Sequence, residues 1–446
     1  MAYRVRTLLG VVSFAFLLTG CNDEPETPPT YTVGGTVSGV AGRDFVLSNG
    51  LGGNIPVAAN ATTFTFAAVP EGTPYNVTIR QQPSAPGQVC TVTNGSGTVG
   101  TENVTSIVVT CEKTTDKFAY VTNPTHKSLA IYSIGESGMP IPVSDAFAIA
   151  DSEPSSIIFE PSKRFGYVAN GATATLTVLS INENNGAPTI VATVPTSVPV
   201  FELAVDPVGR FLYVSSTQDQ VRAYAINQTD GTLTDVPGSP FVLGGAGREL
   251  KVDPTGTYLY VANETLGALN AFAIDQTTGA LTPLPGSPFA AVASALGVEI
   301  DPAGERLYSV SRAAGAIAGF SIDAATGALT PLAGSPYTAT ASSCSLAINP
   351  LATFAFVPNA ADTSSTVSTF SIGAGGELTQ VSGSPVAAGT DPCSVAVHPS
   401  GSFVYVANSG SANVSGYSVD ANTGVLTAIA GSPFGALAGS STIVIR

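Results

Sequence analysis

A repeat of 46 to 49 residues constrains the fold of this chain more than any other feature. Each copy has an aromatic residue in a strand-like stretch resembling Y-V-x-N, and these residues are Tyr120, Tyr167, Tyr213, Tyr260, Tyr308, Phe356 and Tyr405. A period of this length, with four strand-like stretches per copy, is typical of a β-propeller blade. The seven copies therefore predict an all-β fold, with a seven-bladed β-propeller over residues 118–446.

The turns of the repeat have their own chemistry. In the copy beginning at Asp253, Asp253-Pro254-Thr255-Gly256 and Thr278-Gly279 separate the strand-like stretches. Proline fixes φ and glycine accepts positive φ, so both sequences favour tight turns. The repeat begins in the second strand of a blade and ends on residues 441–446, which align with the inner strands. We therefore expect the last strand to complete the first blade and remove an open sheet edge.

Composition excludes several classes of function. The chain has a net charge of -15 and only 16 basic residues, so we expect no nucleic-acid partner. There is no C-x-x-C pair, histidine cluster or phosphate-binding glycine motif in a convincing context, so no cofactor or metal is expected. Asp275, Asp323 and Asp420 lie in D-x-x-T-G turns. One carboxylate per turn is too few for a dedicated calcium site.

The N-terminus has the pattern of a targeting segment. Arg4 and Arg6 precede a short apolar run, and residues 1–20 are predicted to be a signal peptide. Leu18-Thr19-Gly20-Cys21 resembles a bacterial lipobox, so we expect acylated Cys21 to anchor the chain to a membrane. The alternative is an ordinary secretory signal with an incidental cysteine. Residues 21–30 form an acidic, proline-rich linker, and Asn22, which is not aspartate, favours the outer membrane.

Residues 31–112 are predicted to form a separate small β-sandwich. Alternating apolar runs are separated by Gly, Pro and Asn turns, as in immunoglobulin-like or prealbumin-like modules with six or seven antiparallel strands. Cys90 and Cys111 lie on its last two expected strands. In an exported protein these two cysteines are expected to form a disulfide. A spacer or adhesive role is expected for this module.

The repeated P-x-G-x-F-x-Y-V-A-N and T-G-x-L patterns resemble those of the seven-bladed lactonase family, which includes 6-phosphogluconolactonases and a carboxy-muconate cyclase. The resemblance covers residues 118–446 and implies the propeller fold. The family's P-H-x-H motif aligns with Pro154, but the residues on either side of this proline are Glu153 and Ser155 where the family carries histidine. The acidic, basic-ended loop that follows in the family falls on residues 170–175, which carry no ionisable side chain.

A group of charged residues lies on the expected inner strands, where the other blades carry small or apolar residues. The candidate channel site consists of Glu202, Arg248, Glu249, Lys251 and Glu299. Lys251 and Glu299 hold the same position in adjacent blades and are expected to pair. One interpretation is a structural salt-bridge network. The other is a small-molecule site in which Arg248 or Lys251 holds an anion and a glutamate acts as a base, with Arg312 and His126 on loops at the same rim.

Cys344 and Cys393 each stand six residues before a turn proline, so they occupy one position in adjacent blades. Because inner strands converge near the axis, we expect them to form a disulfide between blades; the alternative is two free buried thiols. His398 occupies a turn position that carries Asp or Asn in other copies, so it is expected to cap a turn.

Two functional hypotheses follow. The first is a lipid-anchored propeller of the cell envelope that binds a protein, glycan or small molecule and lacks the family's catalytic motif. The second is a lactonase-like hydrolase that opens a sugar or carboxylic lactone with a rebuilt site. The absence of the family's ionisable residues favours the first.

Overall fold

The computed structural model describes residues 28–41, 45–81, 83, 88–113, 118–134, 137–143, 146–149, 153–183, 185–339, 342–361, 364–436 and 439–446. These residues form strands and turns without a helix, as the periodicity predicts. None of the described residues forms a helix long and apolar enough to cross a membrane. The predicted signal peptide, Cys21 and most of the predicted linker lie outside the described residues.

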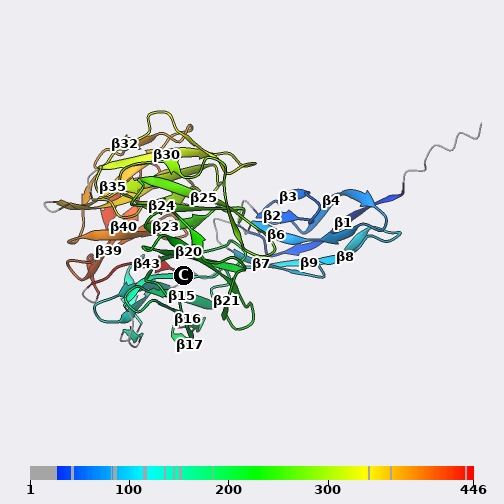
Figure 1. The fold of residues 1–446 in the computed structure, drawn as a ribbon, viewed down its shortest axis with the longest axis horizontal. Coiled ribbons are helices and arrows are strands. Elements are labelled where there is room, and N and C mark those ends of the chain that lie inside the picture. Colours follow the sequence, from blue (N-terminus) through cyan, green and yellow to red (C-terminus); the bar gives the residue numbers. More distant parts are fainter. Residues whose placement is uncertain are drawn as a thin grey trace, which may run out of the picture.

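The repeat forms seven sheets in the described part of the chain, arranged as the blades of a propeller (Figure 1). Blade 1 contains β43 (Ile443–Ile445), β10 (Phe118–Asn123), β11 (Ser128–Ile134), β12 (Pro140–Pro142) and β13 (Phe147–Ala148). Blade 2 contains β14 (Pro154–Phe159), β15 (Phe165–Asn170), β16 (Thr175–Ile181) and β17 (Pro188–Pro195). Blade 3 contains β18 (Val200–Val205), β19 (Phe211–Ser216), β20 (Gln220–Ile226), β21 (Leu233–Asp235) and β22 (Phe241–Val242).

The remaining blades repeat the order of blade 3. Blade 4 contains β23 (Gly247–Val252), β24 (Tyr258–Asn263), β25 (Ala268–Ile274), β26 (Leu281–Pro283) and β27 (Phe289–Ala290). Blade 5 contains β28 (Ala295–Ile300), β29 (Arg306–Ser311), β30 (Ala316–Ile322), β31 (Leu329–Pro331) and β32 (Tyr337–Thr338). Blade 6 contains β33 (Ala347–Ile348), β34 (Phe354–Ala361), β35 (Ser364–Ile372), β36 (Leu378–Gln380) and β37 (Val386–Ala387). Blade 7 contains β38 (Pro392–Val397), β39 (Phe403–Asn408), β40 (Asn413–Val419), β41 (Leu426–Ala428) and β42 (Phe434–Gly435).

The C-terminal strand closes the ring, as predicted. Strand β43 pairs antiparallel with β10 in the register Ala119↔Ile445, Tyr120↔Val444 and Val121↔Ile443. The last strand of the chain is therefore the innermost strand of blade 1. The pairing gives β10 an inner neighbour and joins the two ends of the repeat in one sheet.

The repeated tyrosine on the second strand of each blade forms a latch to the following blade. In six blades its hydroxyl donates a hydrogen bond of 2.5 to 3.1 Å to a glycine carbonyl in the outer turn of the next blade. Tyr260, for example, donates to Gly327, and Tyr405 of blade 7 donates to Gly138 of blade 1. Blade 6 has Phe356 at this position and lacks the hydroxyl.

The outer strands of blades 3 to 7 are interrupted by a Gly-Ser-Pro sequence whose Ser-Pro peptide is cis. The serine hydroxyl accepts a hydrogen bond from the backbone of the third strand, as when Ser287 accepts from the Ala271 amide at 2.9 Å. The chain on either side of the interruption pairs with the same third strand, as β26 and β27 both pair with β25. The interruption therefore shortens the exposed outer edge of these blades.

The N-terminal module consists of three small sheets with its own apolar core. They contain β4-β1-β9-β7, β3-β2-β6 and β5-β8, formed by β1 (Thr30–Ser38), β2 (Phe45–Ser48), β3 (Asn54–Val57), β4 (Thr63–Pro70), β5 (Pro74–Asn76), β6 (Thr78–Gln81), β7 (Gln88–Thr93), β8 (Ser96–Thr98) and β9 (Val104–Lys113). The expectation of purely antiparallel strands is wrong, because β1 and β9 run parallel. The first and last strands of the module lie side by side in the same direction, a pairing that residue alternation does not reveal.

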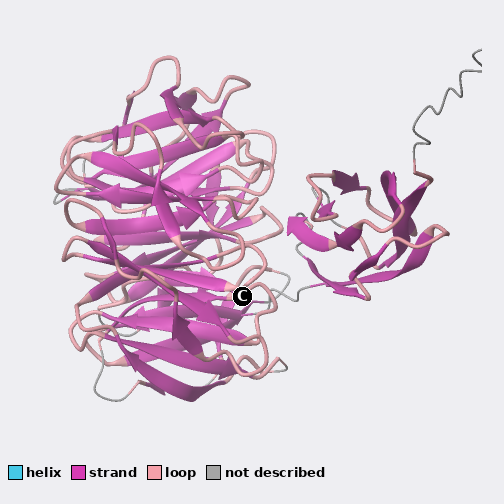
Figure 2. Ribbon diagram, turned by 45° about the vertical axis from the view of Figure 1, so that its right-hand side comes forward, coloured by secondary structure: helices cyan, strands magenta, loops and turns pink. Residues whose placement is uncertain are grey.

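The module lies beside one face of the propeller, next to the side where the C-terminal residue emerges (Figure 2). Within the module, Cys90 and Cys111 are directly opposed on β7 and β9 and form a disulfide. Among the residues that the structure describes, no strand is shared between the sheets of the module and those of the propeller.

Candidate functional site

The inner strands of the blades surround a cavity of about 500 Å³ at the axis of the propeller. Side chains reach it from equivalent positions on neighbouring inner strands. One level, five residues before each turn proline, carries Ser156, Glu202, Glu249, Gly297, Ser345 and Ser394. Charged groups at this level are therefore restricted to blades 3 and 4, and hydroxyl or small groups occupy the others.

A β-bulge explains why consecutive residues of one strand line the cavity. The register of β23 against β24 shifts between Gly247 and Leu250, so one extra residue lies in this stretch of β23. A bulge changes the direction of the side chains within it and is common beside active sites. Arg248 and Glu249 both line the cavity for this reason. The same shift occurs in β18 between Val200 and Leu203, which brings Phe201 and Glu202 to the wall together.

Lys251 lies at the centre of the charged cluster. Its Nζ is 2.9 Å from Glu299 Oε2 on blade 5 and 3.4 Å from Glu249 Oε1 on its own strand. The other carboxylate oxygen of Glu249 accepts a hydrogen bond of 3.1 Å from the Val298 amide. The expected pairing of Lys251 with Glu299 is therefore present, and the cluster also links blade 4 to blade 5.

Glu202 extends the cluster into blade 2. Its Oε2 accepts a hydrogen bond of 2.5 Å from the Ser156 hydroxyl, which lies at the same level on the adjacent inner strand. Ser156 itself is buried. The serine therefore holds one carboxylate oxygen of Glu202 in place, and the other oxygen accepts no side-chain hydrogen bond from the described residues.

Burial raises the pKa values of two glutamate carboxyl groups in the cluster above the value of glutamate in water. Loss of hydration raises the pKa of Glu202 to about 7, although the Ser156 hydroxyl and the charge of Lys251 oppose the shift. Burial raises the pKa of Glu249 to about 8, and repulsion from Glu202 and Glu299 contributes to this rise. For Lys251, burial acts against the ammonium form, but the charges of Glu299 and Glu249 outweigh it and raise its pKa.

The side chains of Glu249, Glu299 and Lys251 nevertheless keep 19%, 21% and 34% of their surface accessible. All three residues line the axial cavity, so this surface is open to the contents of the cavity. The cluster therefore lies deep in the protein, and a small molecule in the cavity can contact it. Carboxyl groups with pKa values near neutrality in such a position can exchange protons at the pH where most enzymes work.

Arg248 and Arg312 line the cavity at the start of the inner strands. The Arg248 guanidinium donates to Glu264 Oε2, with Nε at 2.6 Å, and lies over the Phe201 ring at 4.7 Å from its centroid. Arg312 is exposed and forms no side-chain hydrogen bond or ion pair among the described residues. His126, expected at the same rim, does not line the cavity.

The two remaining cysteines form part of the cavity wall. Cys344 and Cys393 are joined by a disulfide with a Cα separation of 5.1 Å. Blade 6 has an inner strand of only two residues, whereas β23, β28 and β38 have six each. The disulfide, together with a 2.8 Å hydrogen bond from the Ser345 hydroxyl to the Cys393 carbonyl, attaches this irregular segment to blade 7.

Other sequence-predicted residues have structural roles. His398 caps its turn, with Nδ1 accepting a 3.2 Å hydrogen bond from the Ser400 amide. Asp275, Asp323 and Asp420 accept hydrogen bonds from amides of their own turns. No group of three or more metal-ligating side chains occurs in the part of the chain that the structure describes. Ser155, at the aligned histidine position, donates to the Phe201 and Ala169 carbonyls.

Sequence reasoning missed three contacts of this site. The Ser156–Glu202 hydrogen bond joins residues 46 positions apart, on the inner strands of two adjacent blades. The Arg248–Glu264 pair joins an inner strand to a loop after the second strand of the same blade. The stacking of Arg248 on Phe201 depends on both bulges. A level-by-level alignment of the inner strands was the one signal that could have revealed the first.

Comparisons with known proteins agree with this architecture. The family described as "Lactonase, 7-bladed beta-propeller" matches residues 88–201, 156–295 and 337–435. A protein from Serratia proteamaculans named 6-phosphogluconolactonase is 27% identical over 132 residues, which cover 28% of this chain and 40% of that protein. The match thus spans less than half of that relative.

Solved structures resemble the propeller at low sequence identity, which shows the fold alone. The periplasmic gluconolactonase of Pseudomonas aeruginosa is 18% identical with a TM-score of 0.63, over 74% of this chain and 98% of that one. A Bacteroides fragilis protein proposed to be a 6-phosphogluconolactonase is also 18% identical, with a TM-score of 0.65 over 75% of this chain and 99% of that one. The family match covers more than half of the chain, so the chain belongs to the seven-bladed β-propeller lactonase family.

Proposed function

We propose that this protein hydrolyses a lactone, of a sugar or a related carboxylic acid, in the axial cavity of its propeller. The observation that carries the proposal is the cluster of Glu202, Glu249 and Lys251, in which two carboxyl groups with pKa values of about 7 and about 8 lie beside a cation in one cavity. Membership of the lactonase family and the name of the Serratia relative support the same reaction class.

The chemistry requires three functions at one carbonyl group. A base takes a proton from water as the water oxygen attacks the lactone carbonyl carbon, and a positive group stabilises the tetrahedral oxyanion. The bond from this carbon to the ring oxygen then breaks, and an acid protonates that oxygen. The products are the open-chain hydroxyl and a carboxylic acid, which ionises in solution.

The cluster can supply all three functions. Glu202, with the lower pKa of the two, is the base, and the Ser156 hydrogen bond fixes its orientation. Glu249, with the higher pKa, remains protonated at neutral pH and is the acid. Lys251 keeps its charge and faces the developing oxyanion, while Glu299 holds the ammonium group at 2.9 Å. Two carboxyl groups with separated pKa values are the usual arrangement for an acid and a base in one site.

Export through the signal peptide and anchoring by acylated Cys21 remain part of the proposal. The support is the sequence of residues 1–30, together with the fold likeness to a gluconolactonase named as periplasmic. We place the protein at the outer membrane because Asn22 follows Cys21.

The test is hydrolysis of glucono-δ-lactone and of a γ-lactone by the full chain, measured by acid release against a buffer blank. Glu202→Gln should lower kcat/KM by about 10²- to 10⁴-fold, the usual contribution of a general base. Glu305→Gln is the control, because this glutamate is 68% exposed and lies outside the cavity. The kcat/KM of the parent should rise through a pH of about 7 and fall through about 8. A rate equal to that of buffer, or one unchanged in Glu202→Gln and Glu249→Gln, would refute the proposal.

A second candidate is a binding or scaffold protein with an inactive cavity, as the sequence favoured. The observation for it is that Arg248 and Lys251 are both already paired with carboxylates, Glu264 and Glu299. Under this hypothesis the cluster joins blades and has no substrate. Absence of hydrolysis, with a loss of stability in Lys251→Met, would support the second candidate.

A further inference from the structure

The N-terminal module and the propeller together border a second cavity, of about 760 Å³. The propeller wall consists of the inner D-P-x-G turns and the outer turns of blades 3 and 4. The module wall comes from β2, β5, β6, β7, β8 and the segments beside them. We call this space the intermodule cleft.

The cleft is separate from the axial cavity. Arg248 lies at the beginning of β23, whereas Thr255 and Gly256, which line the cleft, lie in the turn that follows the end of this strand. The rim with Arg248 and Arg312 and the cleft are therefore on opposite faces of the propeller. A ligand in the cleft would not block that rim.

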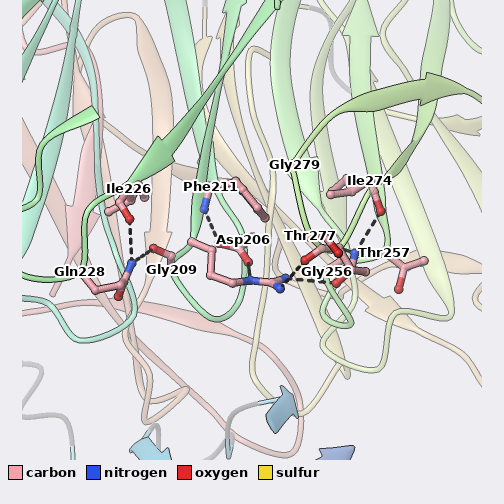
Figure 3. Close-up of polar contacts among 12 residues, drawn as sticks. Asp206, Gly209, Phe211, Ile226, Gln228, Gly256, Thr257, Ile274, Thr277 and Gly279 are labelled. Carbon is pink, nitrogen blue, oxygen red and sulfur yellow. Dashed lines mark hydrogen bonds and ion pairs between the residues drawn. The ribbon is translucent and has the colours of Figure 1, made fainter. Parts of the chain in front are cut away.

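Side-chain hydrogen bonds hold the propeller wall in place. Gln228 donates to the Gly209 carbonyl at 2.5 Å and to the Ile226 carbonyl at 3.3 Å (Figure 3). Gln276 makes the same two contacts in blade 4, with Gly256 and Ile274. Arg210 joins the two blades by donating to the Gln276 carbonyl at 2.7 Å and to its side-chain oxygen at 3.1 Å.

Blades 3 and 4 differ from other blades at this position. Gln228 and Gln276 follow the first residue of the outer turn, and the corresponding residues in blades 5 and 7 are Ala324 and Ala421. The two glutamines are thus found in the two blades that border the cleft. The fold of the repeat does not require glutamine at this position, because the equivalent turns of blades 5 and 7 form with alanine.

The lining of the cleft is dominated by neutral hydrogen-bonding side chains. They are Ser48, Asn76, Thr78, Ser96, Gln228, Thr255, Thr257, Gln276 and Thr277. Its charged residues are Arg80, Arg210 and Asp206, and the last two are paired, with Arg210 Nε 3.1 Å from Asp206 Oδ2. Among the described residues that line the cleft, Arg80 is thus left as an uncompensated positive charge, in a chain of net charge -15.

Arg80 faces the propeller from β6 of the module. Its charge reaches Tyr258 of blade 4, where it opposes the rise in that phenol's pKa that burial causes. The Arg80 guanidinium forms no hydrogen bond or ion pair within the described part of the chain. It therefore keeps its donors for a ligand, and guanidinium donors favour carboxylate or phosphate oxygens.

We propose that the intermodule cleft binds an acidic saccharide, with Arg80 on its carboxylate and hydroxyl side chains of both walls on its sugar hydroxyls, while Gln228 and Gln276 hold the propeller wall in shape. A polyol needs many donors and acceptors at once, which the neutral lining supplies. The Arg80 guanidinium can hold one carboxylate of such a saccharide. This proposal does not depend on lactone hydrolysis. The cleft would bind the protein to a carboxylated glycan, and the rim of the axial cavity on the opposite face would stay accessible.

The test is calorimetric titration of the full chain with trigalacturonate, and with maltotriose and citrate as comparison probes. Trigalacturonate should bind at least tenfold more tightly than either, because only it has both sugar hydroxyls and carboxylates. Arg80→Gln should weaken trigalacturonate binding about tenfold, as expected for a lost charge-assisted hydrogen bond. Thr277→Val, on the propeller wall, should weaken it about threefold.

Lys127→Gln is the matched control, because it removes one positive charge from a loop of blade 1 outside the cleft. Its affinity should equal that of the parent. Glu202→Gln should also bind like the parent, so failure of lactone hydrolysis leaves this result intact. Equal affinity for maltotriose would overturn the role of Arg80, equal affinity for citrate would overturn the saccharide, and no binding of trigalacturonate would overturn the site.

Discussion

The tyrosine latch permits a stability prediction with an internal control. Tyr260 is fully buried, and its hydroxyl donates a 2.8 Å hydrogen bond to the Gly327 carbonyl of the next blade. Tyr260→Phe removes the hydroxyl and preserves the ring, so packing changes little. A buried hydrogen bond of this type contributes roughly 1 kcal/mol to stability. We therefore expect the free energy of unfolding to fall by about 1 kcal/mol.

Blade 6 offers the reverse change. Phe356 is fully buried at the position of the latch tyrosine. The turn it faces, Asp420 to Gly424 in blade 7, has the D-x-x-T-G sequence of the turn that receives Tyr260 in blade 5. Phe356→Tyr should place its hydroxyl on the Gly424 carbonyl. The expected gain is about 1 kcal/mol, equal in size and opposite in sign to the first change.

Urea unfolding at pH 7, followed by circular dichroism, measures both variants. All six latch tyrosines have raised pKa values, chiefly because of burial, so they remain protonated at this pH. The two single variants should move the unfolding midpoint in opposite directions, and the double variant should return close to the parent. If Tyr260→Phe leaves the midpoint unchanged, or Phe356→Tyr lowers it, the latch does not stabilise the ring.

The other predictions concern the cysteines and Ser156. Replacing Cys344 and Cys393 with serine should cost roughly 4 kcal/mol in the chain-entropy model for their separation of 49 residues; thiol counting on the unreduced, denatured parent should find neither cysteine free. Ser156→Ala removes a hydrogen bond that lowers the pKa of Glu202, so the acidic limb of the pH–rate profile should move to higher pH; an unmoved limb would exclude Glu202 as the base. Cys21→Ala should release the protein from the membrane fraction, and a parent that incorporates no labelled fatty acid would contradict acylation.

The propeller could be predicted from the sequence because each blade repeats the same local instructions. The spacing of Tyr120, Tyr167 and their equivalents sets the number of blades, and the D-P-x-G and T-G turns mark their strands. The phase of the repeat also predicts that residues 441–446 pair with the first blade, which they do. Cys344 and Cys393 follow from the same alignment, since equal positions in adjacent blades are neighbours at the axis.

The unpredicted features depend on contacts between distant segments. The parallel pairing of β1 with β9 joins the ends of the module, and no local pattern encodes its direction. The bulge at Arg248 and Glu249 breaks the alternation on which strand reading relies. The intermodule cleft forms only where the module lies against the propeller. The sequence of the module and the sequence of the propeller do not, taken separately, predict that arrangement.

The chemical differences among the blades are concentrated in two of them. Residues at equivalent positions of similar blades have the same structural role. Functional groups are therefore expected where the residue in one blade differs from its equivalents in the other blades. Blades 3 and 4 provide Glu202 and the pair Glu249 and Lys251 at the axial cavity. The same blades provide Gln228 and Gln276 at the intermodule cleft on the other face. Substitutions that exchange these residues for their equivalents in blades 6 and 7 should therefore preserve the fold while removing each proposed site separately.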